Sequence, residues 1–245
     1  MPIIYLSPST QEGNMYVTGS GSEEYNMNRL ADAMEPYLRA NTIRFTRNTP
    51  SMTAGSSIRQ ANQGYYDFYL ALHSNGAPPE RYGEVRGVIA FYYPGSTNGK
   101  RAAEIFADNL RGIYPLPELV TTRATTTLGE VRDPKAPAVL LEIGYHDNIS
   151  DARWVEDNTE TIARNLVQSL TEYFGLPFIE PITPYNATVS VSSGNLNLRA
   201  KPSTDAAVVA NLPNGTVVRV YGVWQGWAAV GYGDLAGYVS MDYLR

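Results

Sequence analysis

The sequence of 245 residues contains no cysteine, which excludes disulfides, thiolate metal ligands and a cysteine nucleophile. It also lacks an excess of positive charge, with 19 Lys and Arg against 24 Asp and Glu, a net charge of -5 and no basic cluster. Binding to nucleic acid depends on basic side chains that neutralise phosphates. We therefore expect no nucleic-acid partner.

Long apolar runs are absent as well, and none approaches the length of a transmembrane helix, so we expect no membrane partner. The opening residues, MPIIYLSPS, lack the basic start and long apolar middle of a signal peptide. If the protein acts outside the cell, we expect export by another route or prior removal of a leader. Tyrosine is abundant, at 18 residues, and exposed tyrosines favour amphipathic ligands such as sugars and peptides.

Residues 1–175 alternate between strand and helix patterns. Apolar runs at Ile3–Leu6, Phe68–Leu72 and Ala138–Ile143 predict buried strands, and helical spacing recurs between them and once more up to Tyr173. Such alternation is typical of an α/β fold. We predict a mostly parallel twisted sheet with flanking helices. Pro36 is expected to kink or loosen the first helix.

The composition then changes, and the helical pattern disappears. The proline-rich segment GLPFIEPITP, Gly175–Pro184, predicts a semi-rigid linker, and short strand-like runs follow it. Asn214-Gly215 is a typical hairpin turn. We predict an α/β domain at 1–175, a linker at 176–185 and a small all-β barrel at 186–245.

Two of the predicted strands end in residues capable of chemistry. His73 follows one apolar run, and Glu142 terminates the run Ala-Val-Leu-Leu. Sites in α/β sheets form beyond the carboxyl ends of strands. We interpret His73 as a zinc ligand rather than a structural histidine, and Glu142 as a general base rather than the partner of Arg59 or Arg132.

A pair of glutamates lies at the start of the first predicted helix. Ser20 and Glu23 fit the S-x-x-E capping box, which gives Glu23 a structural role. Both glutamates also suit the positive end of a helix dipole. Glu24 remains free of the capping box, and we predict it as a second zinc ligand.

These residues belong to segments that resemble the type-3 zinc N-acetylmuramoyl-L-alanine amidases. The resemblance runs in register through IYLSPS, EEYNMNRLA, TIRFTRN, IRQANQGYYDFYLALHSNG, LGEVR and PAVLLEIGYHDN. It implies that Glu24 and His73 hold Zn²⁺, that Glu142 is the catalytic glutamate, and that the substrate is peptidoglycan. It also implies action in the extracellular space or cell wall.

Residues 186–245 resemble bacterial SH3-like domains in GNLNLRAKPST, LPNGTVVRV and WAAVGYGDLAGYVS. Such domains commonly hold wall hydrolases on peptidoglycan peptides. Several aromatic residues could line a peptide groove: Trp224, Trp227, Tyr232, Tyr238 and Tyr243. We expect Trp227 in the core and Trp224 partly exposed beside a turn at Gln225-Gly226.

One departure from the family pattern concerns the third zinc ligand. The first strand of these amidases normally ends in a histidine, and here Thr10 occupies that position with Gln11 next, neither of them a usual zinc ligand. Three alternatives stay open. His146 completes the ligand set, a loop residue such as Glu12 replaces the histidine, or the site binds metal weakly or not at all.

The sequence therefore predicts a hydrolase that cleaves the amide between N-acetylmuramic acid and L-alanine of the stem peptide, with Zn²⁺ held by Glu24, His73 and His146. Arg123 and Arg132 are possible partners of stem-peptide carboxylates. Two alternatives remain: an impaired, amidase-like wall-binding protein, and a zinc peptidase acting within the stem peptide.

Overall fold

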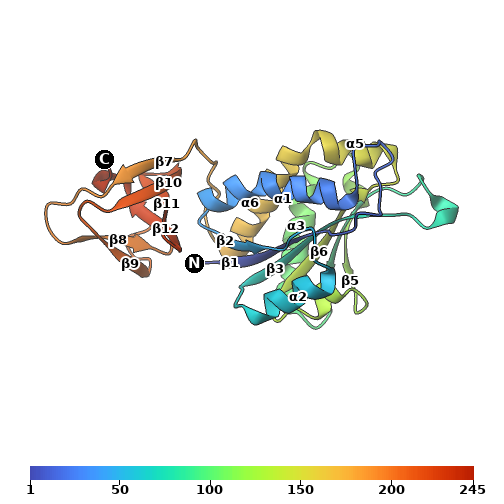
Figure 1. Ribbon diagram of the computed structural model, residues 1–245, viewed down its shortest axis with the longest axis horizontal. Coiled ribbons are helices and arrows are strands. Elements are labelled where there is room, and N and C mark those ends of the chain that lie inside the picture. The colour runs from blue at the N-terminus through green and yellow to red at the C-terminus, as the bar shows by residue number, and fades with distance from the viewer. The chain divides into compact units, whose positions relative to one another are not determined.

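The computed structural model describes residues 1–245, which divide into two compact units (Figure 1). The larger unit contains 3–34 and 45–173, and the smaller contains 1–2, 35–44 and 174–245. Up to Phe174 the helices and strands are β1 Ile3–Pro8, α1 Glu23–Ala40, β2 Arg44–Arg47, α2 Ala54–Gln63, β3 Phe68–Asn75, β4 Val88–Tyr92, α3 Thr97–Arg111, β5 Val120–Ala124, α4 Gly129–Arg132, β6 Ala138–Tyr145, α5 Ile149–Asp157 and α6 Thr159–Phe174. No helix is long and apolar enough to cross a membrane.

The larger unit is built on a mixed six-stranded sheet with the order β2-β1-β3-β6-β4-β5. β1, β3 and β6 run parallel to one another, and β4 is antiparallel to β6 but parallel to β5. This sheet confirms the predicted fold class. Because β1, β3 and β6 are neighbours with the same direction, their carboxyl ends meet at one edge of the sheet.

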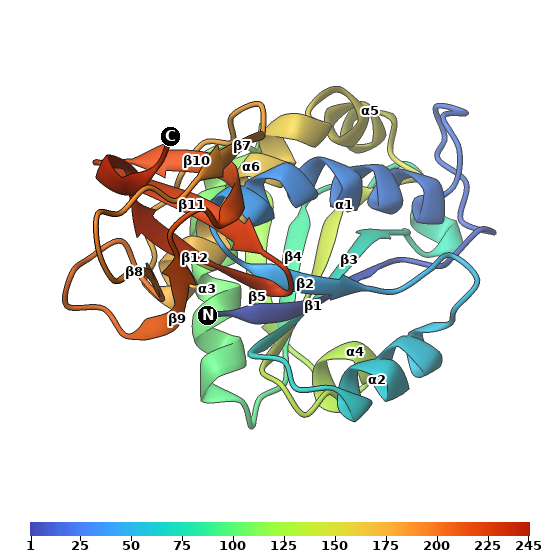
Figure 2. The same cartoon turned by 60° about the vertical axis from the view of Figure 1, so that its left-hand side comes forward.

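Helices cover both faces of this sheet, which explains why β3 and β6 are continuous apolar runs. On one face α2 and α4 pack on a cluster that includes Tyr5, Tyr69 and Leu140 (Figure 2). On the other face Phe106 of α3 and Tyr173 of α6 pack against Phe68, with ring centroids 6.2 and 5.0 Å apart. The central strands therefore hold their terminal polar residues on a rigid frame.

Helix boundaries differ from the sequence-based expectation. The capping box predicted at Ser20 is wrong: α1 begins at Glu23, and the Ser22 hydroxyl accepts a hydrogen bond from Tyr25 N at 3.1 Å. The helix continues through Pro36 to Ala40. The long helix predicted to end at Tyr173 is two helices, α5 and α6, since α5 ends at Asp157.

The smaller unit contains a six-stranded antiparallel β domain, in the order β7-β10-β11-β12-β8-β9, which confirms the predicted small all-β fold. Its strands are β7 Tyr185–Thr188, β8 Asn195–Arg199, β9 Val208–Pro213, β10 Val217–Trp224, β11 Trp227–Tyr232 and β12 Leu235–Ser240. Gln225 and Gly226 both have positive φ, as a two-residue hairpin turn between β10 and β11 requires.

The hairpin predicted at Asn214-Gly215 is wrong, because β9 and β10 are not neighbours in the sheet. This turn instead bonds to the loop after β7: Gly215 N donates to Val189 O at 2.8 Å, and Val191 N donates to Asn214 Oδ1 at 2.9 Å. The dipeptide forms a tight turn, as its sequence indicates. The two strands that this turn connects do not pair with each other, because β9 pairs with β8, and β10 pairs with β7 and β11.

Candidate active site

The carboxyl ends of β1, β3 and β6 bring together the residues that the sequence singled out. Pro8 is in register with Leu72, and His73 is in register with Glu142 on the neighbouring strand. The loop after β1 adds Gln11, and the first turn of α1 adds a carboxylate. This is the sheet edge at which an α/β fold builds a site.

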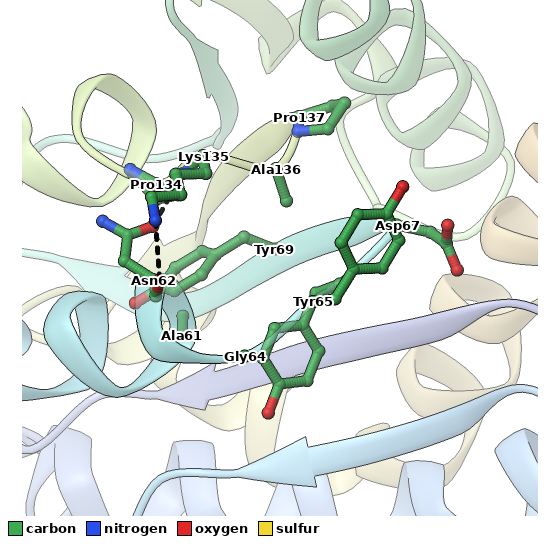
Figure 3. Close-up of a pocket in the computed structure, with 11 residues that line it drawn as sticks. Ala61, Asn62, Gly64, Tyr65, Asp67, Tyr69, Pro134, Lys135, Ala136 and Pro137 are labelled. Carbon is green, nitrogen blue, oxygen red and sulfur yellow. Dashed lines mark hydrogen bonds between the residues drawn. The ribbon is translucent and has the colours of Figure 1, made fainter.

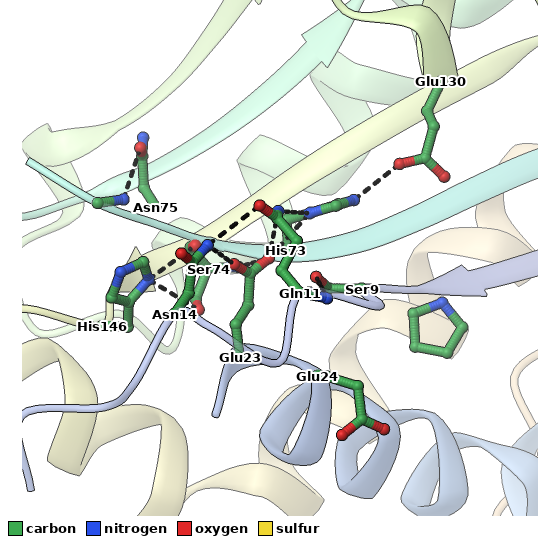
Figure 4. A network of polar contacts seen from close by, with 12 residues as sticks. Ser9, Gln11, Asn14, Glu23, Glu24, His73, Ser74, Asn75, Glu130 and His146 are labelled. Carbon is green, nitrogen blue, oxygen red and sulfur yellow. Dashed lines mark hydrogen bonds and ion pairs between the residues drawn. The ribbon is translucent and has the colours of Figure 1, made fainter. Parts of the chain in front are cut away.

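His73 lies between two carboxylates and is 8% exposed (Figure 4). Its Nδ1 is 2.9 Å from Glu23 Oε1, and its Nε2 is 2.8 Å from Glu130 Oε2. Burial lowers the pKa of His73, but the hydrogen bonds and charges of both carboxylates outweigh it and raise the pKa well above its usual range. Burial raises the pKa values of Glu23 and Glu130, but contact with His73 lowers both overall. The site is thus a buried triad of one imidazolium and two carboxylates.

Glu24, which the sequence predicts as a zinc ligand, does not face His73 in the structure. Glu24 Oε1 accepts a hydrogen bond from Asn28 Nδ2 of its own helix at 2.9 Å, and the side chain points away from His73 (Figure 4). Glu23 occupies the position instead. The physical reason is the helix start: with Ser22 as the cap, Glu23 and Glu24 are both in the first turn, and one residue rotates a side chain by about 100° around the axis.

Gln11 brings a third side chain to the Nδ1 side of His73. Its Nε2 is 3.4 Å from Glu23 Oε1 and 3.4 Å from His73 Nδ1. Asn14 Nδ2 supports the group, donating to Glu23 Oε2 at 2.7 Å and to Gln11 Oε1 at 3.1 Å. Three polar side chains from a loop, a helix and a strand therefore meet at one point.

These residues fit a divalent metal ion. Donor atoms bound to tetrahedral zinc at about 2.0–2.1 Å lie roughly 3.3 Å from one another. The separations of 2.9, 3.4 and 3.4 Å among Glu23, His73 and Gln11 match that spacing. The Gln11 amide presents its NH₂ group to this point, and a half-turn of the amide replaces it with the oxygen, the usual metal donor of an amide.

The structure does not bring His146, which the sequence predicts as a zinc ligand, into this cluster. No three His, Cys, Asp or Glu side chains are grouped so that they could hold a metal ion. His146 Nδ1 is 3.1 Å from Ser74 O, and the backbone of His146 is bonded to Asn75 O at 2.9 Å. These contacts hold the ring against the end of β3. Glu12, the alternative loop residue, is exposed.

One carboxylate oxygen of Glu142 has no hydrogen-bond donor. Its Oε2 is buried and makes no hydrogen bond. Burial raises the pKa of Glu142 to about 7, as do the nearby charges of Glu23 and Glu130, against the opposing effect of His73. Arg132 is not its partner, because that side chain forms an exposed ion pair with Asp133. A buried, unpartnered carboxylate beside the cluster has the environment expected of a general base.

The raised pKa of Glu142 predicts a dependence of stability on pH. The unfolded carboxyl titrates at 4.5 and the folded one at about 7, so the folded state binds this proton more tightly. Its contribution to the free energy of unfolding therefore falls as pH rises between these values, by about 3 kcal/mol in total. Glu142→Gln removes this loss. The test is denaturant unfolding of chelator-treated protein from about pH 5 to about pH 8. The free energy of unfolding of Glu142→Gln should rise relative to that of the wild type as pH rises. Parallel plots of unfolding free energy against pH for the two proteins would contradict the prediction.

Two of the hollows in the structure lie around this sheet. One of about 400 Å³ opens onto His73 and Glu130 and is lined also by Thr10 and Gln11. The other, of about 320 Å³, lies beside the residues that precede β3 and β6 (Figure 3). In this second hollow Asn62 and Lys135 bond to each other, through Lys135 N to Asn62 Oδ1 at 2.8 Å and Nζ to Asn62 O at 3.0 Å. The first hollow borders the candidate active site through Gln11, His73 and Glu130, whereas Glu23 and Glu142 do not line it.

The β domain has a hollow of its own, of about 450 Å³, lined by Trp227, Tyr243 and Arg199 among others. Trp227 is half-buried, so its predicted place in the core is wrong: its side chain forms a wall of the hollow. Trp224 is partly exposed, as expected, and Tyr238 is fully buried. Tyr243 is exposed.

Comparison with known proteins agrees with this architecture. Residues 9–172 match the N-acetylmuramoyl-L-alanine amidase family model, and residues 194–245 match the bacterial SH3 domain model. No curated protein matches the sequence. The chain belongs to the N-acetylmuramoyl-L-alanine amidase family, which confirms the predicted family and its peptidoglycan hydrolase class. The match covers the part of the chain that supplies every residue of the candidate site.

Solved structures of amidases share the fold of the larger unit at low sequence identity. The amidase AmiC2 of Nostoc punctiforme superposes with a TM-score of 0.63 at 14% identity, covering 71% of this chain and 97% of that one. An amidase from Clostridium difficile 630 gives 0.63 at 16%, with coverages of 71% and 97%. The catalytic domain of CwlV from Bacillus (Paenibacillus) polymyxa var. colistinus gives 0.61 at 18%, with 71% and 99%.

Proposed function

We propose that the protein is a zinc-dependent amidase that cleaves the bond between N-acetylmuramic acid and L-alanine, with Glu23, His73 and Gln11 as the metal ligands. The observation that supports this is the meeting of these three side chains at one point, at separations that suit a tetrahedral ion. Gln11 takes the role of the histidine that ends the first strand in the family pattern. Its amide has to rotate to present oxygen, giving up its hydrogen bond from Asn14.

When bound, zinc supplies a Lewis acid for the scissile carbonyl and makes water acidic enough to deprotonate near neutral pH. Glu142 accepts the proton of the attacking water and later delivers it to the leaving amine of L-alanine. The pKa of about 7 suits both steps, because a carboxyl at that value accepts and releases protons at similar cost near neutrality. Asn14 holds the second carboxylate oxygen of Glu23 and fixes its orientation.

The SH3 domain is proposed to hold the enzyme on the cell wall through stem peptides. Its hollow combines two aromatic walls, Trp227 and Tyr243, with polar groups from Asn195 and Arg199. Aromatic rings beside hydrogen-bonding groups suit a short peptide with both apolar and polar parts. Action of the enzyme at the cell wall is part of the same proposal.

Digestion of purified peptidoglycan by the full chain tests the proposal. With added Zn²⁺ we expect release of stem peptides that begin with a free L-alanine amine, from glycan strands that stay intact, and no release after chelation. Mass spectrometry of the products identifies the bond. Fragments cut within the stem peptide would indicate a peptidase instead, and wall binding with no products at any zinc concentration would indicate a binding protein.

A further inference from the structure

The side of His73 opposite Glu23 and Gln11 is occupied by a buried carboxylate that the proposed mechanism does not use. Glu130 is 5% exposed, and its Oε2 is 2.8 Å from His73 Nε2 (Figure 4). Its other oxygen, Oε1, accepts hydrogen bonds from Ser7 Oγ and Tyr69 Oη, both at 2.7 Å. Each carboxylate oxygen therefore has a donor, and the group is fully satisfied.

Each nitrogen of His73 faces a carboxylate, Glu23 at Nδ1 and Glu130 at Nε2, so a metal bound by this ring has to replace the proton of one of the two nitrogens. An ionised carboxylate only accepts hydrogen bonds, so the short contact to Glu130 Oε2 requires a proton on Nε2. The hydroxyls of Ser7 and Tyr69 both donate to Glu130 Oε1, and such donors stabilise an ionised carboxylate. With Nε2 protonated, Nδ1 is the nitrogen whose lone pair is available to a metal, and Nδ1 is the atom that faces Glu23 and Gln11.

The fold fixes Glu130 in this place. It belongs to α4, a four-residue helix between β5 and β6 that packs against β6 and α2. The neighbouring Val131 is buried in the core cluster on that face of the sheet, and Leu128 packs against it. Ser7 and Tyr69 come from β1 and β3, the two strands whose ends form the site. The carboxylate is thus tied to the same rigid frame as the residues it contacts.

We propose that Glu130 is a positioning residue: it holds the imidazole of His73 as the Nε2-protonated tautomer, with Nδ1 directed at the metal point formed with Glu23 and Gln11. The inference rests on the proposed function, since it assigns Glu130 a task toward the metal. Outer carboxylates that accept a hydrogen bond from a ligating histidine typically contribute about 10- to 100-fold to metal affinity. Glu130 acts through His73 and does not contact the substrate.

The test compares Glu130→Gln with Tyr69→Phe in the full chain. Glu130→Gln replaces the obligate acceptor by an amide of the same size, and we expect zinc affinity, measured by calorimetric titration with Zn²⁺ alone, to fall about 10- to 100-fold. The stoichiometry at saturation should stay at one. Tyr69→Phe removes one donor to Glu130 but leaves the carboxylate on His73, and we expect a loss of less than about threefold. Equal affinities for wild type and Glu130→Gln would overturn the proposal.

A spectroscopic measurement reports the tautomer directly and does not depend on the variant folding. The chain contains two histidines, so ¹⁵N-imidazole spectra of the zinc-loaded wild type are simple to assign with His146→Asn. We expect the His73 signals of a ring protonated at Nε2 and bound to metal at Nδ1, and a mixed or reversed pattern in Glu130→Gln. A wild-type ring protonated at Nδ1 would overturn the proposal even if Glu130→Gln does not fold.

The outcomes separate this inference from the proposed function. If the wild type binds no zinc and releases no L-alanine-terminated stems, the proposed function fails. If the wild type binds zinc and cleaves, but Glu130→Gln matches it in affinity and tautomer, the assignment of Glu130 alone fails.

The same variant should also differ in its kinetics. At saturating zinc, Glu130→Gln should have a lower kcat and a nearly unchanged KM, because His73 is no longer held in its orientation.

Discussion

Glu142→Gln is expected to reduce amidase activity by about 10²- to 10⁴-fold, the range typical of removing a general acid–base group. The side chain lies next to His73 across the β3–β6 pair, with a buried oxygen that no other group satisfies. An amide of the same shape cannot take a proton from water. The assay is the rate at which new L-alanine amines appear during digestion of purified peptidoglycan at saturating zinc.

The same variant should bind zinc normally, since Glu142 is not one of the proposed ligands. Zinc content and calorimetric affinity of Glu142→Gln within about threefold of wild type would show that the loss lies in proton transfer and not in the metal. Glu24→Gln is the matched control, because it makes the same chemical change at a glutamate that bonds to Asn28 of its own helix. Activity of Glu142→Gln above a tenth of the wild-type rate would remove Glu142 from the mechanism.

The second large effect is a difference between two adjacent glutamates. Glu23→Ala is expected to weaken zinc binding by more than about 100-fold, beyond the loss typical of an outer partner, and to abolish activity at low zinc. Glu24→Ala should stay within about threefold of wild type. The physical reason is that Glu23 Oε1 lies 2.9 Å from His73 Nδ1, whereas Glu24 points away from it.

Calorimetry and metal analysis on both variants measure this difference, and the reverse ranking would restore the sequence-based assignment of Glu24.

Two substitutions of Gln11 are expected to change zinc affinity in opposite directions. Gln11→Ala should weaken zinc binding. Gln11→His should strengthen it, because an imidazole nitrogen suits zinc better than an amide oxygen. Unchanged affinity in both Gln11 variants would show that the third donor is not Gln11.

The sequence by itself determined the class of fold and two of the residues at the site. Apolar runs that end in His73 and Glu142 are visible without a structure, because a buried strand tolerates a polar residue best where it emerges from the sheet. Parallel neighbouring strands then bring their carboxyl ends to one edge, so the convergence of these residues could be predicted. The change from alternating helices and strands to short β runs likewise indicated the second domain.

Tertiary structure decided which side chains lie around His73. To choose between Glu23 and Glu24, the first residue of the helix has to be known to within one residue. The observed cap is Ser22, whereas the predicted cap was Ser20. Glu130 could have been suspected as a charge beside the apolar Leu128 and Val131, but no local spacing connects α4 with His73.

The role of Gln11, a residue passed over as an unusual ligand, depends equally on distant partners. His146 lay near Glu142 in sequence but is held against the backbone of Ser74. Local sequence patterns indicate which residues are buried and which residues lie at the end of a strand. The direction of a side chain at the end of a strand or helix depends on the packing of segments far apart in the chain, and so only the folded structure could determine it.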